Sequence, residues 1–189
     1  MAIATFKELM NVTNSTMCVW KEYSRGYAPD EVADKLDNAT LEWISSLTET
    51  LDIWLSKGLS LTQGELILAR TNMGSLVESW LKFFYCVYLE DYRKSPKVNK
   101  SGAIDPDEKT MRFEDLKQYS RGILWESGDK TDKWIDKIQG YRNAIHSFQP
   151  RAIGTPYEFI EDFTAYCEFV ELILDRLPPI EDNLELFYQ

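Results

Sequence analysis

Apolar residues recur along this chain at spacings of three and four positions and rarely alternate with polar ones. This is the period of an amphipathic helix, and no segment alternates for the length of a strand. The pattern predicts four strong helices, over residues 31 to 57, from about Thr62 to a stripe ending at Tyr88, over 131 to 148 and over 155 to 177. We expect a shorter helix over 113 to 126 and an additional short helix within the first 29 residues.

Residues typical of helix ends mark several of these boundaries. Asp30 directly follows Pro29 and can cap the first helix. Glu65 stands three positions after Thr62, as in a capping box. The fourth helix is expected to stop at "LPP", because proline cannot continue a helix.

Each strong helix carries a stripe of residues predicted to face the core. The stripes are Val32, Leu36, Trp43, Leu47, Leu51 and Trp54; Leu66, Met73, Val77, Trp80, Phe84 and Tyr88; Trp134, Ile138, Tyr141, Ile145 and Phe148; and Ile160, Phe163, Cys167, Val170, Leu174 and Leu177. Arg70 interrupts the second stripe. We expect it to pair with a buried carboxylate, or alternatively to face the third helix.

Long amphipathic helices with short connections pack antiparallel. The predicted fold is therefore all-α, an up-and-down bundle of four main helices plus one or two short ones. A chain of 189 residues suits a single domain over 1–189, with a core bundle at about 31–177 and a tail at 178–189. Residues 93–112 are rich in Lys, Pro, Gly and Ser, which predicts a mobile loop.

The formal net charge of −10 argues against an anionic partner for the chain as a whole. Residues 93 to 151, however, hold 13 Lys and Arg against 9 Asp and Glu, a net charge of +4. A local basic surface of this kind could receive RNA, although solvated lysines in a loop are the alternative interpretation.

Other features of the composition exclude several classes of site. No apolar run approaches the roughly 20 residues of a membrane span, and no leader pattern is evident, so we expect a cytoplasmic protein without a membrane partner. Cys18, Cys86 and Cys167 are scattered and are predicted to be buried free thiols. One histidine with three dispersed cysteines forms no zinc pattern, so no metal or other cofactor is expected. The adjacent Glu161 and Asp162 are predicted to be solvated.

The stretch "QGYRNAIHSFQP", residues 139 to 150, contains the single histidine, His146. Arg142 lies four positions earlier, and Asn143 follows it. On a continuous α-helix, residues four apart are neighbours on one face, with Cβ atoms about 6 Å apart. Arg142 and His146 would then lie at the boundary between core and solvent, where both could act on one small group.

This motif resembles that of the HEPN family, all-helical domains of prokaryotic toxins, antiviral proteins and RNA-processing factors. The family mark is an arginine, usually followed by a polar residue, and then a histidine that four or more residues separate from the arginine. The stretch "RNAIH" has the same order of residues, with three residues between Arg142 and His146. The segment "GSLVESWLKFFY", with Glu78 and Lys82, is similar to an earlier helix of such bundles. The chain departs from the nuclease pattern by one residue of spacing, and it has Phe148 where some toxin members have tyrosine.

The resemblance implies a metal-independent endoribonuclease of toxin or antiviral type, working as a homodimer that brings two motifs to one cleft. In such a site His146 would transfer protons, Arg142 would stabilise the phosphate, and Asn143 would orient the phosphate or the imidazole. Two alternatives remain open. One is an inactive HEPN-like interaction or regulatory module with a protein partner, in which Arg142 pairs with a carboxylate. The other is an unrelated bundle with a small-molecule or peptide groove, which the aromatic content favours.

Overall fold

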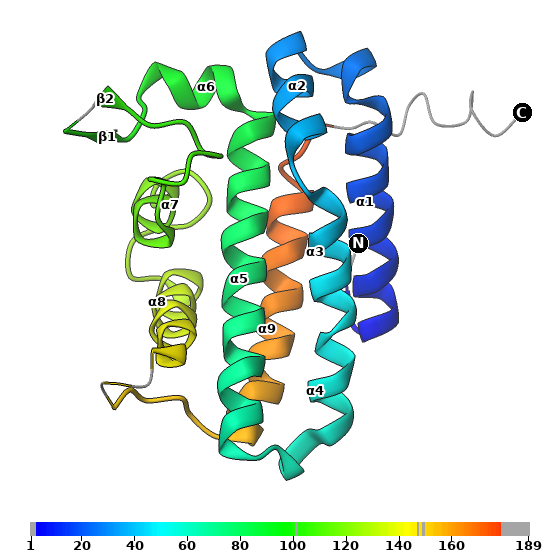
Figure 1. The fold of residues 1–189 in the computed structure, drawn as a ribbon, viewed down its shortest axis with the longest axis vertical. Coiled ribbons are helices and arrows are strands. Elements are labelled where there is room, and N and C mark those ends of the chain that lie inside the picture. The colour runs from blue at the N-terminus through cyan, green and yellow to red at the C-terminus, as the bar shows by residue number, and fades with distance from the viewer. Residues whose placement is uncertain (1–2, 101, 147, 149, 179–189) are drawn as a thin grey trace, which may run out of the picture.

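The computed structural model describes residues 3–100, 102–146, 148 and 150–178. It confirms an all-α chain (Figure 1). The elements are α1 (Phe6–Tyr27), α2 (Asp30–Asn38), α3 (Leu41–Glu49), α4 (Leu51–Lys57), the 3₁₀ helix η1 (Gly58–Ser60), α5 (Gln63–Val87), α6 (Leu89–Lys94), β1 (Val98–Asn99), β2 (Gly102–Ala103), α7 (Phe113–Ser120), α8 (Lys130–Arg142), the 3₁₀ helix η2 (Asn143–Ile145) and α9 (Pro156–Leu174). The predicted tail at 178–189 lies outside the described residues, apart from Pro178.

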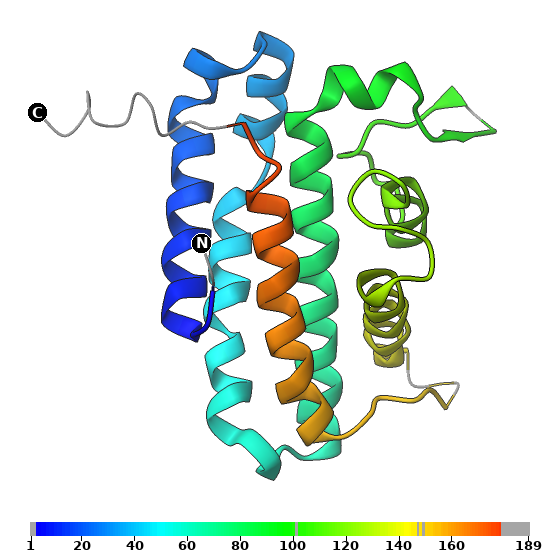
Figure 2. The ribbon, with the colours of Figure 1, turned by 180° about the vertical axis from the view of Figure 1, so that it is seen from behind.

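Helix α5 is the central element of the fold. Figures 1 and 2 show α7 and α8 on one side of α5 and α1 on the other, with α9 running parallel beside it. Its predicted stripe is confirmed, since Leu66, Met73, Val77, Trp80 and Phe84 are buried. Its capping box is confirmed as well, because the Thr62 hydroxyl accepts from the backbone N–H of Glu65, whose carboxylate accepts from the Thr62 N–H at 2.9 Å.

The first helix is much longer than predicted. Instead of a short helix, α1 spans 22 residues and begins with a capping box formed by Thr5 and Glu8. Its buried face contains Thr13 and Ser24 among apolar residues. These polar positions interrupt the hydrophobic period, which explains why the sequence pattern underestimated the helix.

The predicted helix over 31 to 57 is three helices. The chain becomes extended at Ala39, with ψ 149°, between α2 and α3. Thr50, between α3 and α4, keeps helical backbone angles, with φ −65° and ψ −16°. Val32, Leu36 and Leu51 are buried as expected. Trp43 is 63% exposed rather than in the core, because the break at Ala39 rotates α3 relative to α2.

The segment predicted as a mobile loop has more anchors than its composition suggests. Val98 pairs with Ala103 in a short antiparallel hairpin, and Ile104 and Met111 are buried. The Tyr92 hydroxyl donates to the Ile104 carbonyl at 2.8 Å. The segment is therefore anchored by two buried apolar side chains, while the mobility of 93–112 stays a prediction.

The later helices are shorter than predicted. Helix α7 ends at Ser120, and Gly122 follows in a turn with φ of 77°. Helix α9 begins after its Thr155 cap, as expected, but ends at Leu174 rather than Leu177. Its core face is also shifted. Ile160 is 38% exposed, while the buried residues are Phe159, Asp162, Tyr166, Cys167, Phe169, Val170 and Ile173.

Arg70 is fully buried and forms an ion pair with Asp162 of α9, which confirms the predicted pairing with a buried carboxylate. Its guanidinium also lies 4.4 Å from the ring centroid of Tyr141 on α8. The expectation that Asp162 is solvated is wrong. Its carboxylate is buried because Arg70, Lys137 and the Trp134 indole N–H, at 3.1 Å, all reach it.

The thiols differ in accessibility. Cys18 is exposed, contrary to expectation, while Cys86 and Cys167 are buried, and burial raises the pKa of each of these two to about 12.

A neutral thiol reagent such as iodoacetamide is therefore expected to label Cys18 first in the folded protein. Peptide mass spectrometry after a short exposure checks this. Equal early labelling of Cys86 would contradict the structure.

The pKa of Glu65 is lowered to about 2, mainly by the hydrogen bond from Lys57 and then by those from Thr62. A carboxyl group whose pKa is lowered in the folded protein stabilises the fold at pH values above its ordinary pKa of 4.5. This contribution is lost as the pH falls toward 2. Glu65→Gln is expected to melt below the parent at neutral pH. The gap in melting temperature should shrink progressively as the pH falls below 4.5. A gap that does not change with pH would argue against this account.

Candidate functional site

Arg142 is the last residue of α8, and it pairs with a carboxylate of α5. Its Nη2 donates to Glu78 Oε2 at 2.6 Å. The Arg142 side chain is 33% exposed and that of Glu78 is 14% exposed. The guanidinium therefore lies at the boundary between core and solvent, as predicted, but it already has an anionic partner.

The close approach of α8 to α5 depends on Gly74. A Cβ atom added at this position would lie 2.6 Å from Arg142 Cβ and 2.9 Å from its Cγ. Only glycine fits at this crossing, because real Cβ atoms do not approach that closely. The absence of a side chain at Gly74 brings the Arg142 stem against α5, one turn before Glu78.

His146 does not lie on the same α-helix as Arg142. Helix α8 ends at Arg142, and Asn143–Ile145 form a 3₁₀ turn. His146 follows at φ −84° and ψ 84°, exposed, with its backbone N–H donating to the Asn143 carbonyl at 3.3 Å. The predicted continuous helix over 131 to 148 is wrong, so the α-helical spacing assumed for the Arg142 and His146 pair does not apply.

The same early ending of α8 changes its predicted core stripe. Trp134 and Ile138 are buried as expected, but Ile145 is 42% exposed and Phe148 is fully exposed. Ile135, which is not part of the predicted stripe, is buried. A 3₁₀ turn advances about 120° per residue rather than 100°, which turns residues after Arg142 away from the α-helical stripe.

The structure brings together the two segments in which the HEPN resemblance was seen. Lys82, one turn after Glu78 on α5, has its Nζ 3.4 Å from Glu78 Oε1, while Arg142 approaches the other carboxylate oxygen. One carboxylate thus serves two cations, so this cluster carries a net positive charge. The His146 side chain has no hydrogen bond or ion pair with any residue in the described part of the chain.

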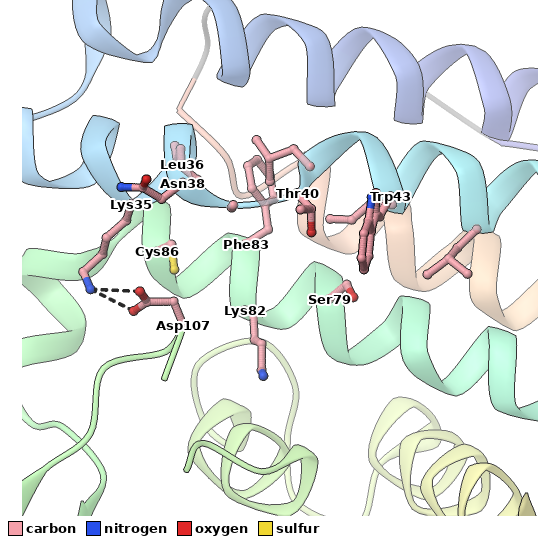
Figure 3. Close-up of a pocket in the computed structure, with 14 residues that line it drawn as sticks. Lys35, Leu36, Asn38, Thr40, Trp43, Ser79, Lys82, Phe83, Cys86 and Asp107 are labelled. Carbon is pink, nitrogen blue, oxygen red and sulfur yellow. Dashed lines mark hydrogen bonds and ion pairs between the residues drawn. The ribbon is translucent and has the colours of Figure 1, made fainter. Parts of the chain in front are cut away.

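A cavity of about 390 Å³ lies between α2, α3 and α5, and Lys82 of the cluster with Glu78 and Arg142 is one of its lining residues (Figure 3). Its lining is Lys35, Leu36, Asn38, Ala39, Thr40, Leu41, Trp43, Ile44, Leu47, Ser79, Lys82, Phe83, Cys86 and Asp107. Sequence reasoning missed this site because it placed Trp43 in the core. The available signal was Thr40 followed by the apolar Leu41, a typical start of a new helix.

The cavity lining includes two titratable groups whose pKa values are raised, the Cys86 thiol and the Lys35 ammonium. Cys86 lies on its wall, but burial raises the thiol pKa to about 12, so the nucleophilic thiolate is not formed near neutral pH. Partial burial favours the neutral form of Lys35, yet hydrogen bonds to Asp107 and Asp105 outweigh it and raise the Lys35 pKa. Lys35 is therefore a charged group at the cavity end.

Among the residues that the structure describes, no group of three or more His, Cys, Asp or Glu is placed to hold a metal ion. Within that same part of the chain, no helix is both long enough and apolar enough to cross a membrane.

No protein-family model, no curated protein and no solved structure matches the chain.

Proposed function

We propose that this chain is a helical-bundle interaction or regulatory module in which Arg142 has a structural role. The observation that carries the proposal is the ion pair between Arg142 and Glu78, with Nη2 and Oε2 separated by 2.6 Å. A half-buried pair of this kind holds the end of α8 on α5. It also offsets the positive charge that a phosphate-binding arginine would offer to RNA.

The position of His146 supports the same proposal. It follows the 3₁₀ turn, is exposed, and has no side-chain partner among the described residues to hold the imidazole in one orientation. General acid and base catalysis requires a group held within hydrogen-bond reach of the transferred proton. The net charge of −10 further favours a protein partner over a nucleic acid.

The second candidate is the metal-independent endoribonuclease, which two observations favour. Arg142 keeps 33% of its side chain exposed, and its counter-ion Glu78 is shared with Lys82. A homodimer that placed two Arg142 and His146 pairs at one cleft would supply both an acid and a base. Asn143 would then orient the phosphate or the imidazole.

Arg142→Ala and His146→Ala separate the two functions when RNA cleavage and unfolding are measured on the same samples. If the chain is an interaction module, the parent protein should leave RNA intact in the presence of a chelator. Arg142→Ala then lowers the free energy of unfolding by about 1 to 3 kcal/mol, because Glu78 loses its partner. His146→Ala changes it by less than about 0.5 kcal/mol. Chelator-resistant cleavage that falls at least about tenfold in both variants would instead establish the nuclease.

Glu78→Gln provides the matched control. If the ion pair is structural, Glu78→Gln destabilises the protein much as Arg142→Ala does, and the double variant loses less than the two single losses combined. If Arg142 is catalytic, Glu78→Gln retains cleavage because the guanidinium remains. The exposed Arg151, changed to Ala, controls for loss of a surface charge. Light scattering of the parent tests the expected homodimer, and a monomer would remove the two-motif cleft.

A further inference from the structure

We propose that the cavity between α2, α3 and α5 binds a small amphipathic anion, a molecule with a flat apolar body and one anionic group. This inference goes beyond the module function and does not depend on Arg142 or His146. It rests on the volume and lining of the cavity, on the exposure of Trp43 and on the charges around it.

The cavity suits a small organic molecule in size and in the chemistry of its walls. Its volume of about 390 Å³ lies within the range of roughly 300 to 1,000 Å³ typical of ligand pockets. Ile44, Leu47 and Phe83 supply apolar surface. The hydroxyl-bearing Thr40 and Ser79 lie among them, so the lining combines apolar contact with a few polar groups.

Trp43 is a large aromatic residue that the fold leaves exposed in the lining of the cavity. Its side chain is 63% exposed, although tryptophan is among the residues whose burial contributes most to stability. Figure 3 shows it projecting from α3 toward the side of α5 that carries Ser79. A planar ligand body between this ring and the apolar wall would remove both surfaces from water.

The charges favour an anionic group on the ligand. Lys82 contributes its stem to the lining, and its ammonium shares the Glu78 carboxylate with Arg142, which leaves a net positive charge beside the cavity. In Figure 3 this ammonium points toward α7, and its flexible stem allows it to turn toward a bound anion. At the opposite end one cation serves two carboxylates, because Lys35 pairs with Asp107 at 2.8 Å and with Asp105 at 3.1 Å, so no positive charge is left over there for an anion.

A single anionic group fits this arrangement better than an RNA strand does. Strand binding needs a row of cations along the phosphate backbone. Here Asp107 stands at one end of the cavity, and the incompletely neutralised cation is at the Lys82 side. The cavity therefore takes a compact carboxylate or sulfonate with an aromatic body.

The test uses two dyes with the same ring system. One is 8-anilinonaphthalene-1-sulfonate, which is anionic, and the other is N-phenyl-1-naphthylamine, which lacks the sulfonate. Full-length folded protein should bind the anionic dye saturably, at one site per chain. Trp43→Ala should raise its Kd about tenfold, the equivalent of 1.4 kcal/mol, by removing the stacking surface. Lys82→Gln should raise the Kd of the anionic dye about threefold and leave that of the neutral dye unchanged.

Two substitutions outside the cavity serve as controls for the change in the Kd of the anionic dye. Leu59 is 68% exposed on η1, so Leu59→Ala removes an exposed apolar side chain away from the cavity and should not change the Kd. Lys130 is 78% exposed and pairs with Glu168, so Lys130→Gln should behave like the parent. Circular dichroism confirms that each variant is folded.

Three outcomes would overturn the proposal. The first is dye binding that does not saturate at one site, and the second is equal binding by parent and Trp43→Ala. The third is displacement of the dye by a short oligoribonucleotide at lower concentration than by naphthalene-1-sulfonate, which would assign the cavity to RNA. Because none of these readouts involves Arg142, failure here leaves the module proposal standing, and failure of the module leaves this site unaffected.

Discussion

Arg70→Met is expected to lower the free energy of unfolding by about 3 to 5 kcal/mol, the cost typical of breaking a buried ion pair on one side. The substitution keeps an apolar stem of similar length, so it removes the charge and little volume. Asp162 would remain 2% exposed inside the protein, with Lys137 as its remaining cationic partner. A buried carboxylate that loses its main cation is strongly disfavoured.

The size of the expected loss follows from the number of groups that Arg70 contacts. Its Nε donates to the Ile153 carbonyl at 3.1 Å, and its guanidinium lies 4.4 Å from the Tyr141 ring centroid and 5.4 Å from that of Phe159. The residue therefore joins α5 to α8, to α9 and to the segment before α9. Loss of Arg70 should also loosen the end of α8 that carries Arg142.

Urea unfolding followed by circular dichroism measures this effect. The Arg70→Met and Asp162→Asn double variant should lose less stability than the two single variants combined, because the second change removes the unpaired charge. Arg25, whose side chain is 58% exposed in its pairs with Asp34 and Asp37, is the matched control. Arg25→Met should have a far smaller effect. A loss for Arg70→Met below about 1 kcal/mol would show that the pair is not the main support of this region.

Gly74→Ala is expected to destabilise the protein by about 1 to 3 kcal/mol, the usual cost of overpacking a tight contact. The new methyl group would meet Arg142 Cβ at 2.6 Å. That atom is attached directly to the α8 backbone and cannot move away as the end of a flexible side chain could. The α5 and α8 helices must therefore separate, which should weaken the Arg142 to Glu78 pair as well.

Gly140→Ala is the matched control for this prediction. Gly140 lies within α8, and a Cβ there would meet nothing within 4 Å. Alanine should therefore stabilise the helix by about 0.5 to 1 kcal/mol, because it restricts the unfolded chain. Thermal unfolding of both variants gives the comparison. A stabilising Gly74→Ala would mean that the helices adjust easily at this crossing.

The helical class, and those features that depend on neighbouring residues, could be predicted from the amino-acid sequence. The cap at Thr62 with Glu65 and the start of α9 at Thr155 are set by contacts within one helical turn, so their signals are local. The sequence also predicted that Arg70 pairs with a buried carboxylate, since an arginine within an apolar stripe cannot stay unpaired. The sequence did not identify Asp162 as this partner, because Asp162 was expected to be exposed to solvent.

The positions where the helices break, and the pairs of distant side chains that meet, depend on how the whole chain packs. The extended Ala39, the ending of α8 at Arg142 and the exposure of Trp43 follow from how the helices pack on α5, which can override the local period. Glu78 meets Arg142 because Gly74 lets two helices from distant parts of the chain approach closely. A contact of this kind depends on the shape of both surfaces at their crossing, and neither segment contains that information alone.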